Sequence, residues 1–227
     1  MCRSVGIAML AAVALCGAGC GGGMGDVTAT ESGANTVNGS IQVPAGLHSG
    51  GVSTVNGSIH VGENATVGSA NTVNGSISLG AHASAESLTT VNGSVRLDDA
   101  AHVNAGVTSV NGSMHLKNGT QVGGAVANVN GNIELNAARV GGGLRTVDGD
   151  IKVLGDSHVD DGIVIRKSHS WFSWNSSTPK VVIGPGAVVQ GELRFERKVR
   201  LYVSDKASIG PVIGATVRRF SGDQPPE

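Results

Sequence analysis

The chain has 227 residues and a formal net charge of −1, and it contains 36 glycines but only three phenylalanines, two tryptophans and one tyrosine. This length allows one or two ordinary domains. Such a small aromatic content excludes the thick core of a typical globular domain and leaves a thin core of valine, isoleucine, leucine and alanine.

Residues 1–19 have the features of a lipoprotein signal peptide. One positive charge at Arg3 precedes an apolar run from Val5 to Leu15, which is too short to span a bilayer as a mature helix. The run ends in small residues and a cysteine. We therefore expect the mature chain to begin near residue 20 and to be exported.

The segment Gly17-Ala18-Gly19-Cys20 resembles the lipobox of bacterial lipoproteins. This resemblance implies that Cys20 becomes the acylated first residue, carrying fatty acids such as palmitate. By the sorting rules of that family, Gly21 after the cysteine favours the outer membrane, facing the periplasm or the cell surface. Residues 20–33, which begin with a run of glycines, are then predicted to be a flexible, lipid-anchored tether.

Residues 34–165 are built from seven copies of one phrase, of which TVNGSIQV is the first. The copies follow one another at steps of 18 or 19 residues, which is the signature of a repeat architecture. The apolar positions stay apolar although other residues differ between the copies, which indicates that packing constrains these positions. The copies start at Thr36, Thr54, Thr72, Thr90, Ser109, Asn128 and Thr146.

The end of each phrase alternates apolar and polar residues with the period of a β-strand. Its apolar residues are expected to face inward, and the variable residue between them outward. A third inward position is expected two residues before each phrase. The outward residues are Gln42, His60, Ser78, Arg96, His115, Glu134 and Lys152, and the third inward positions are Val52, Ala70, Leu88, Val107, Val126 and Leu144.

Asn-Gly is a strong turn signal, but the run before it is too short for one arm of a hairpin. We therefore predict a corner, with the chain continuing around a three-sided coil. The fold class is predicted to be all-β, a single-stranded, triangular β-solenoid of about ten rungs. Its stacked corners would form a ladder of asparagines, namely Asn38, Asn56, Asn74, Asn92, Asn111 and Asn130, which Asp148 interrupts in the seventh copy.

After the seventh copy the pattern loosens. Residues 166–180 contain both tryptophans and are predicted to be a loop insertion. Residues 181–219 return to solenoid character and form the terminal rungs, and residues 220–227 are predicted to be a disordered tail. The two parts differ in charge: residues 166–219 contain ten lysines and arginines against three acidic residues, whereas residues 21–165 contain five against twelve.

This basic end offers the candidate binding residues. Arg194, Lys198 and Arg200 would alternate on one strand and face an anionic envelope polymer such as lipopolysaccharide or peptidoglycan. Trp171 and Trp174 could contact a partner or a membrane, or pack back on the solenoid as part of a surface loop. Nucleic acid is not expected as a partner outside the cytoplasm.

No residue pattern predicts a catalytic centre, a metal site or a cofactor. The histidines share no repeat position apart from His60 and His115, which lie in the outward slot. The pairs Asp98-Asp99 and Asp160-Asp161 point to opposite faces if extended, and turn residues are the simpler interpretation. No cysteine–histidine spacing typical of a metal site occurs. The chain is therefore not expected to be an enzyme.

The VNGSI-type phrases resemble those of bacterial adhesin-like β-strand-repeat families, and the segment from Val181 to Ile213 resembles bactofilins, which polymerise. The first resemblance covers about 120 residues and the second about 35. Together they imply a lipid-anchored structural or adhesin-like rod. A self-polymerising, bactofilin-like scaffold and a carbohydrate-active β-helix enzyme remain the alternatives.

Overall fold

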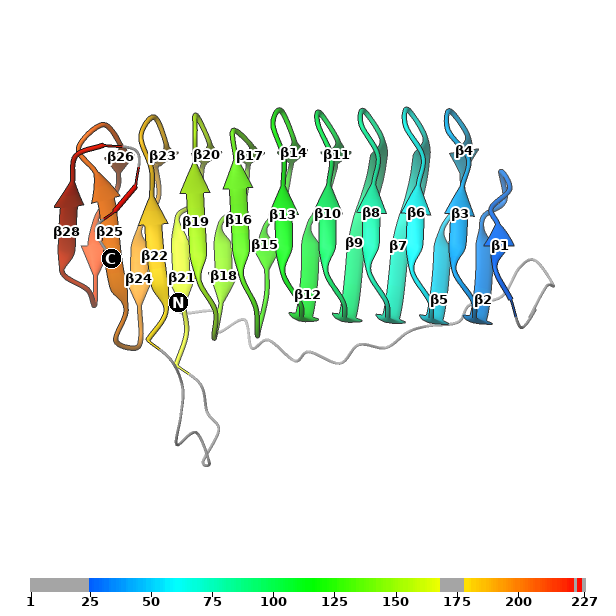
Figure 1. The fold of residues 1–227 in the computed structure, drawn as a ribbon, viewed down its shortest axis with the longest axis horizontal. Coiled ribbons are helices and arrows are strands. Elements are labelled where there is room, and N and C mark those ends of the chain that lie inside the picture. The colour runs from blue at the N-terminus through cyan, green and yellow to red at the C-terminus, as the bar shows by residue number, and fades with distance from the viewer. Residues whose placement is uncertain (1–24, 168–177, 223, 226–227) are drawn as a thin grey trace, which may run out of the picture.

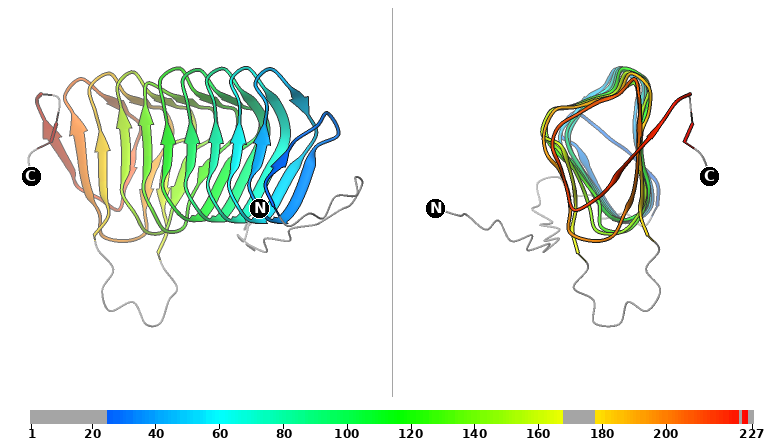
Figure 2. Two further views of the ribbon diagram at one scale, coloured as in Figure 1. Left: turned by 45° about the vertical axis from the view of Figure 1, so that its right-hand side comes forward. Right: turned by 90° about the vertical axis from the view of Figure 1, so that its left-hand side faces the viewer.

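The computed structural model describes residues 25–167, 178–222 and 224–225. Over these ranges the chain winds into a rod of stacked turns whose strands all pair in parallel with those of neighbouring turns (Figure 1). Each turn contributes three strand segments, and the turns superpose when viewed along the rod (Figure 2). The predicted β-solenoid of about ten turns with steps of 18 or 19 residues is confirmed.

The strands form three stacks that run the length of the rod. The first stack contains β1 (Val27–Thr28), β3 (Ile41–Val43), β6 (Ile59–Val61), β8 (Ile77–Leu79), β10 (Val95–Leu97), β13 (Met114–Leu116), β16 (Ile133–Asn136), β19 (Ile151–Leu154), β22 (Lys180–Ile183), β25 (Arg200–Ser204) and β28 (Val217–Phe220).

The second stack contains β4 (His48–Ser49), the first part of β7 (Thr66–Asn74), the first part of β9 (Ser84–Asn92), β11 (His102–Val103), β14 (Gln121–Val122), β17 (Arg139–Val140), β20 (His158–Val159), β23 (Val188–Val189) and β26 (Ser208–Ile209).

The third stack contains β2 (Ala34–Asn38), β5 (Val52–Asn56), the second parts of β7 and β9, β12 (Val107–Asn111), β15 (Val126–Ala127), β18 (Leu144–Thr146), β21 (Ile163–Ile165), β24 (Leu193–Phe195) and β27 (Val212–Ile213).

The core is a thin apolar column enclosed by the three stacks. The apolar residues at the end of each phrase are buried, and so are the six predicted third inward positions. The seven predicted outward residues on the first stack are all at least partly exposed. The expected alternation of inward and outward residues in the first stack is therefore confirmed.

The first residue of each phrase is buried, and in the first six copies its side chain donates a hydrogen bond to a backbone oxygen of the turn before, whereas Thr146 Oγ1 donates to Asp148 in its own turn. Thr72 Oγ1 donates to the carbonyl oxygen of Gly57 at 2.9 Å, and Thr90 Oγ1 donates to that of Gly75 at 2.9 Å. Ser109 makes the same bond at 3.3 Å. No buried side-chain nitrogen or oxygen in the described ranges lacks a hydrogen-bond partner, as burial of polar groups requires.

The glycine of each phrase lies where two successive corners touch. A Cβ atom placed on Gly75 would lie 1.9 Å from the carbonyl oxygen of Gly57, and one on Gly93 would lie 1.9 Å from that of Gly75. The backbones of Gly57, Gly75 and Gly93 are outside the left-handed region. Stacking distance, rather than a positive φ, therefore requires glycine at these corners.

The serine of each phrase bonds to the next turn. The backbone N–H of Ser76 donates to Ser58 Oγ at 3.2 Å, and that of Ser94 donates to Ser76 Oγ at 3.2 Å. The threonine, glycine and serine of the phrase thus each serve the contact between consecutive turns. This contact explains why the phrase is repeated with so little change.

The solenoid is longer at both ends than predicted. β1 pairs with β3 inside residues 20–33, which were predicted to be a tether, because Val27 and Ala29 continue the inward pattern of the first turn. Phe220 belongs to β28 and is buried, so the stack reaches into residues 220–227, which were predicted to be disordered. Both predictions failed because the terminal turns carry no copy of the phrase.

Candidate binding surfaces

The valine of the phrase, unlike the buried residue before it, faces outward on the third stack. Val37 has 45 % of its surface exposed, and its six counterparts are half-buried. The register that pairs Asn38 with Asn56 places each valine beside the next along the rod. The stripe consists of Val37, Val55, Val73, Val91, Val110, Val129 and Val147. We call the outer surface of the third stack over these seven turns the valine face.

A second column of the valine face consists of short uncharged side chains. Asn35, Ser53, Asn71, Thr89, Thr108 and Ala127 are aligned by the strand register and none is buried. The third-stack strand segments of the first six of these turns contain no charged residue. In the seventh, Arg145 ends the uncharged region.

The asparagine row predicted from the sequence borders this face at the corner. Asn56 Nδ2 donates to Asn38 Oδ1 at 2.8 Å, and the same bond joins each later pair at 2.8 to 2.9 Å up to Asn130. Asp148 stacks next to Asn130, but a carboxylate has no N–H to donate. Arg197 Nη1 lies 3.4 Å from the Asp148 carboxylate instead and donates to the carbonyl oxygen of Val147 at 3.0 Å.

The outer surface of the first stack has a mixed and charged character. His60 Nδ1 and Ser78 Oγ are 2.8 Å apart, and His115 Nδ1 lies 3.6 Å from Glu134 Oε2. Asp98, at the end of this surface, contacts Lys117 Nζ at 2.7 Å and Arg96 Nε at 3.1 Å. The hydrogen bond from Lys117, with a smaller contribution from Arg96, lowers the pKa of Asp98 below its ordinary value.

The acidic pairs lie in turns and bends and bind basic neighbours. Asp160 contacts Arg139 at 3.3 Å and His158 at 3.0 Å, whereas Asp161 contacts Arg145 at 3.4 Å. Asp160 and Asp161 are thus divided between different basic partners, whereas Asp98 contacts both Lys117 and Arg96. Among the described residues, no group of three histidine, cysteine, aspartate or glutamate side chains is placed to hold a metal ion.

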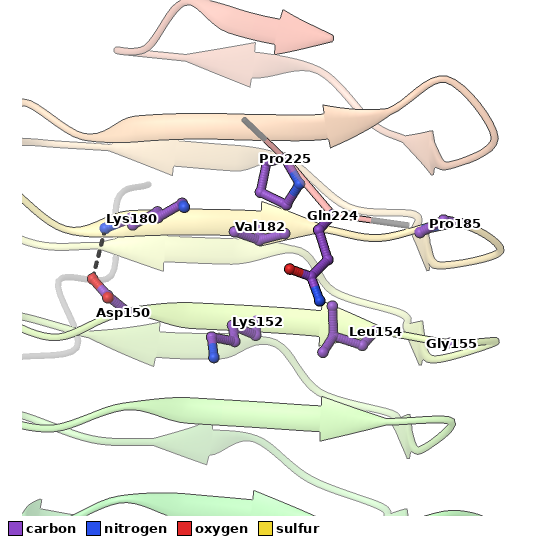
Figure 3. Close-up of a pocket in the computed structure, with 9 residues that line it drawn as sticks. All are labelled: Asp150, Lys152, Leu154, Gly155, Lys180, Val182, Pro185, Gln224 and Pro225. Atoms are coloured by element: carbon purple, nitrogen blue, oxygen red, sulfur yellow. Dashed lines mark hydrogen bonds between the residues drawn. The ribbon is translucent and has the colours of Figure 1, made fainter. Parts of the chain in front are cut away.

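A groove of about 600 Å³ lies on the outer surface of the first stack, beside β19 and β22 (Figure 3). Leu154 and Val182 supply its apolar part, and Lys152 and Lys180 supply two ammonium groups. The Asp150 carboxylate accepts a hydrogen bond from the backbone N–H of Lys180 at 2.7 Å. Gly155, Pro185, Gln224 and Pro225 complete the lining.

The groove adjoins a small apolar cluster outside the main core. Val182, Tyr202 and Phe220 are each at least 94 % buried, and Leu154 packs against them. The ammonium nitrogen of Lys180 lies 5.1 Å from the centroid of the Tyr202 ring. The guanidinium carbon of Arg218 lies 5.9 Å from the same centroid. Cations beside an apolar surface are suited to an anionic group that carries an apolar or sugar body.

The predicted basic stripe does not form. Arg194 is on β24 of the third stack, Arg200 is on β25 of the first stack, and Lys198 lies in the bend between them. The prediction of one alternating strand is wrong because the chain turns a corner at residues 196–199. Arg194 also has an acidic neighbour, Glu196, at 3.8 Å.

Cys20, Trp171 and Trp174 lie outside the described residues. Within residues 25–167, 178–222 and 224–225, no helix is long and apolar enough to cross a membrane. Comparisons of the chain with models of protein families, with curated proteins and with solved structures find no match. Function is therefore inferred from the chain's own surfaces.

Sequence reasoning missed both the valine face and the groove. The sequence did contain one signal for the face: the valine is identical in all seven copies, whereas the outward slot of the first stack holds six different residue types. We interpreted that identity as core packing. The groove had no such signal, because its wall of Gln224 and Pro225 comes from a segment far along the chain.

Proposed function

We propose that this chain is a structural or adhesin-like rod of the bacterial cell envelope that is not catalytic and presents its outer faces to binding partners. One observation carries the proposal: an outward-facing and at least partly exposed residue, the valine of the phrase, is repeated unchanged in seven consecutive turns on one face. Repetition of an exposed side chain along a rod favours contact with an extended partner over chemistry at one point.

A lipid anchor at Cys20 is part of this proposal. It is supported by the signal-like residues 1–19 and by Gly17-Ala18-Gly19-Cys20, and two or more acyl chains would make the attachment stable. Cys20→Ala should move the protein from the outer-membrane fraction to the soluble fraction, whereas Cys2→Ala should leave it in place. Retention of Cys20→Ala in the membrane would contradict the anchor.

The partner class is tested by sedimentation. The groove and the excess of basic residues beyond residue 166 support binding of an anionic envelope polymer. We expect the full chain carrying Cys20→Ala to co-sediment with isolated peptidoglycan or with lipopolysaccharide. Lys152→Gln with Lys180→Gln should weaken this binding several-fold and reduce its salt dependence.

The matched control carries Arg194→Gln and Lys206→Gln, which remove the same charge from the basic end but lie outside the groove. An equal loss of binding in both variants would mean that general charge, and not the groove, attracts the polymer. Failure of the parent chain to bind either polymer would remove anionic polymers from the proposal.

A further inference from the structure

We propose that two copies of this chain pair side by side through the valine face. This inference concerns the third stack, and it depends neither on the lipid anchor nor on the groove. Its starting point is that the fold uses every other member of the phrase: the threonine, asparagine, glycine and serine bond to neighbouring turns, and the isoleucine lies in the core. The valine, in contrast, is apolar and yet faces outward, where it is at least partly exposed.

Strand propensity alone does not account for the valine. β-Branched residues are favoured in strands, but that preference acts equally on both outward columns of the third stack. The other column changes between asparagine, serine, threonine and alanine over the same turns, whereas the valine does not change. A further constraint therefore acts on the outer surface at the valine position.

Charge favours this face over the other surfaces for close contact between two copies. Its first six turns carry no charged side chain in their strand segments, so two copies could approach without desolvating an ion. The first stack, in contrast, displays Arg96, Glu134 and Lys152. A partner bound by the valine face must therefore itself present a flat, uncharged and partly apolar surface.

A second copy satisfies this condition in shape as well as in chemistry. The valines recur at about 4.8 Å, the spacing of paired strands, and only a partner with the same repeat can contact all of them in the same way. A second copy of the chain has the same spacing between its valines because it has the same sequence and fold. Flat sheets that display identical columns of small and β-branched side chains can interdigitate to form a dry interface.

The area available is sufficient for a weak dimer. Seven turns at about 4.8 Å and five residues at about 3.3 Å cover roughly 550 Å² per copy, or roughly 1,100 Å² for the pair. Specific interfaces start at about 1,200 Å², so pairing should depend on concentration in the range from micromolar to millimolar.

Sedimentation velocity on the full chain carrying Cys20→Ala tests the pairing without interference from a lipid. The test variant carries Val55→Lys, Val91→Lys and Val129→Lys, placed in alternate turns so that the lysines do not repel one another strongly. The control carries Gln42→Lys, Ser78→Lys and His115→Lys, in the outward slot of alternate turns of the first stack. Thermal unfolding followed by circular dichroism verifies that both variants fold.

We expect the parent and the control to dimerise, and we expect the valine variant to raise the dissociation constant at least about tenfold. A parent that remains monomeric at about 1 mM would overturn the proposal, because the available area predicts pairing in the range from micromolar to millimolar. An equal effect of the two variants, or an unaffected valine variant, would overturn it as well.

Cross-linking provides a second measurement that does not disturb the face. In a background without Cys2, Cys16 and Cys20, Val91→Cys is expected to form a bridge between two copies with a short bis-maleimide reagent. Ser78→Cys on the first stack should not. A reversed or equal yield would contradict pairing through the valine face.

Discussion

At the corner of each turn, a glycine touches the backbone of the turn before it. Glycine is required here because the backbones of two successive turns lie too close together for a Cβ atom. In other contexts, Asn-Gly is selected because both residues tolerate a positive φ. The same corner binds the buried threonine hydroxyl and the serine N–H. Single residues therefore determine how closely two turns approach.

Gly75→Ala tests this closeness. Its Cβ would overlap the carbonyl oxygen of Gly57, so the two turns must separate, and we expect a loss of at least about 2 kcal/mol in unfolding free energy. Gly51→Ala is the control, because its Cβ would meet the nearest atom at 3.5 Å, an ordinary contact. Urea denaturation measures both, and equal midpoints would contradict the stacking explanation.

Ile77→Asp and Ser78→Asp compare neighbouring residues of β8 with opposite orientation. Ile77 is fully buried, so a carboxylate there has no water and no partner, and we expect a loss of about 3 to 5 kcal/mol. Ser78 is partly exposed, and its change should cost less than about 1 kcal/mol. Thermal melts that shift by the same amount would show that the assignment of faces is wrong.

At the scale of the strands, ion pairs join consecutive turns at their exposed edges. Asp98 follows β10 and Lys117 follows β13, the next strand of the first stack. Folding lowers the pKa of Asp98. The ionised carboxylate therefore stabilises the folded chain at any pH above the pKa that Asp98 has in the unfolded chain. This contribution is lost as the pH falls through the lower, folded-state value.

Lys117→Met is therefore expected to reduce stability at pH 7 by less than about 1 kcal/mol, since the pair is solvent-exposed and screened. The difference from the parent should shrink as the pH falls below the ordinary pKa of 3.8 and disappear below the lower pKa of the folded state. Lys206→Met, which removes a charge away from Asp98, should not show this pH dependence. A deficit that persists unchanged in acid would contradict the role of the ion pair.

The strands also show how far the sequence reveals this structure. The 18-residue period and the alternation around Ile41 and Val43 were sufficient to predict the stacks and the core. The orientation of Val37 was harder to predict, because the buried residue beside it is Thr36, a polar residue that does not mark an inward position, whereas the outward residue is the apolar valine. The failed basic stripe has a similar cause, since a corner separates Arg194 from Arg200.

The groove could not be predicted because it depends on contacts that no local pattern encodes. Its floor is formed by β19 and β22, which pair although residues 155–179 intervene between them. Its remaining wall is contributed by Gln224 and Pro225, from a segment that carries no phrase. Local periodicity thus predicts the regular part of the rod and says little about its irregular end.

At the scale of the whole molecule, the rod is a sum of similar units, and its stability should change in steps of one turn. Removing residues 77–94 joins Ser76 to Val95 and deletes one complete turn while leaving the same local sequence at the junction. We expect a folded rod shorter by about 4.8 Å. X-ray scattering in solution measures the length, and circular dichroism measures the strand content.

Deleting only residues 77–85 is the control. Half a turn is lost, so inward and outward residues of the following turns no longer match those before them. This variant should unfold at a much lower temperature than the one lacking a full turn. Similar melting of the two would contradict a stack of interchangeable turns.

Within the part of the chain that the structure describes, β1 and β28 at the two ends of the first stack each have a neighbouring strand on one side only. β28 carries the exposed Arg218 and Arg219, and charged residues on an edge strand oppose pairing with a further strand. Growth of a filament from this end would have to overcome that charge. The uncharged valine face offers a more favourable route to self-association.

The first stack keeps its register across the interruption in the repeats: Ile151 pairs with Val181, thirty positions later, in the same register as the other turns. Lengthening a chain connection that is already long costs little additional entropy. A peptide epitope or a small reporter domain inserted between Lys167 and Lys180 should therefore leave the pairing of β19 with β22 intact.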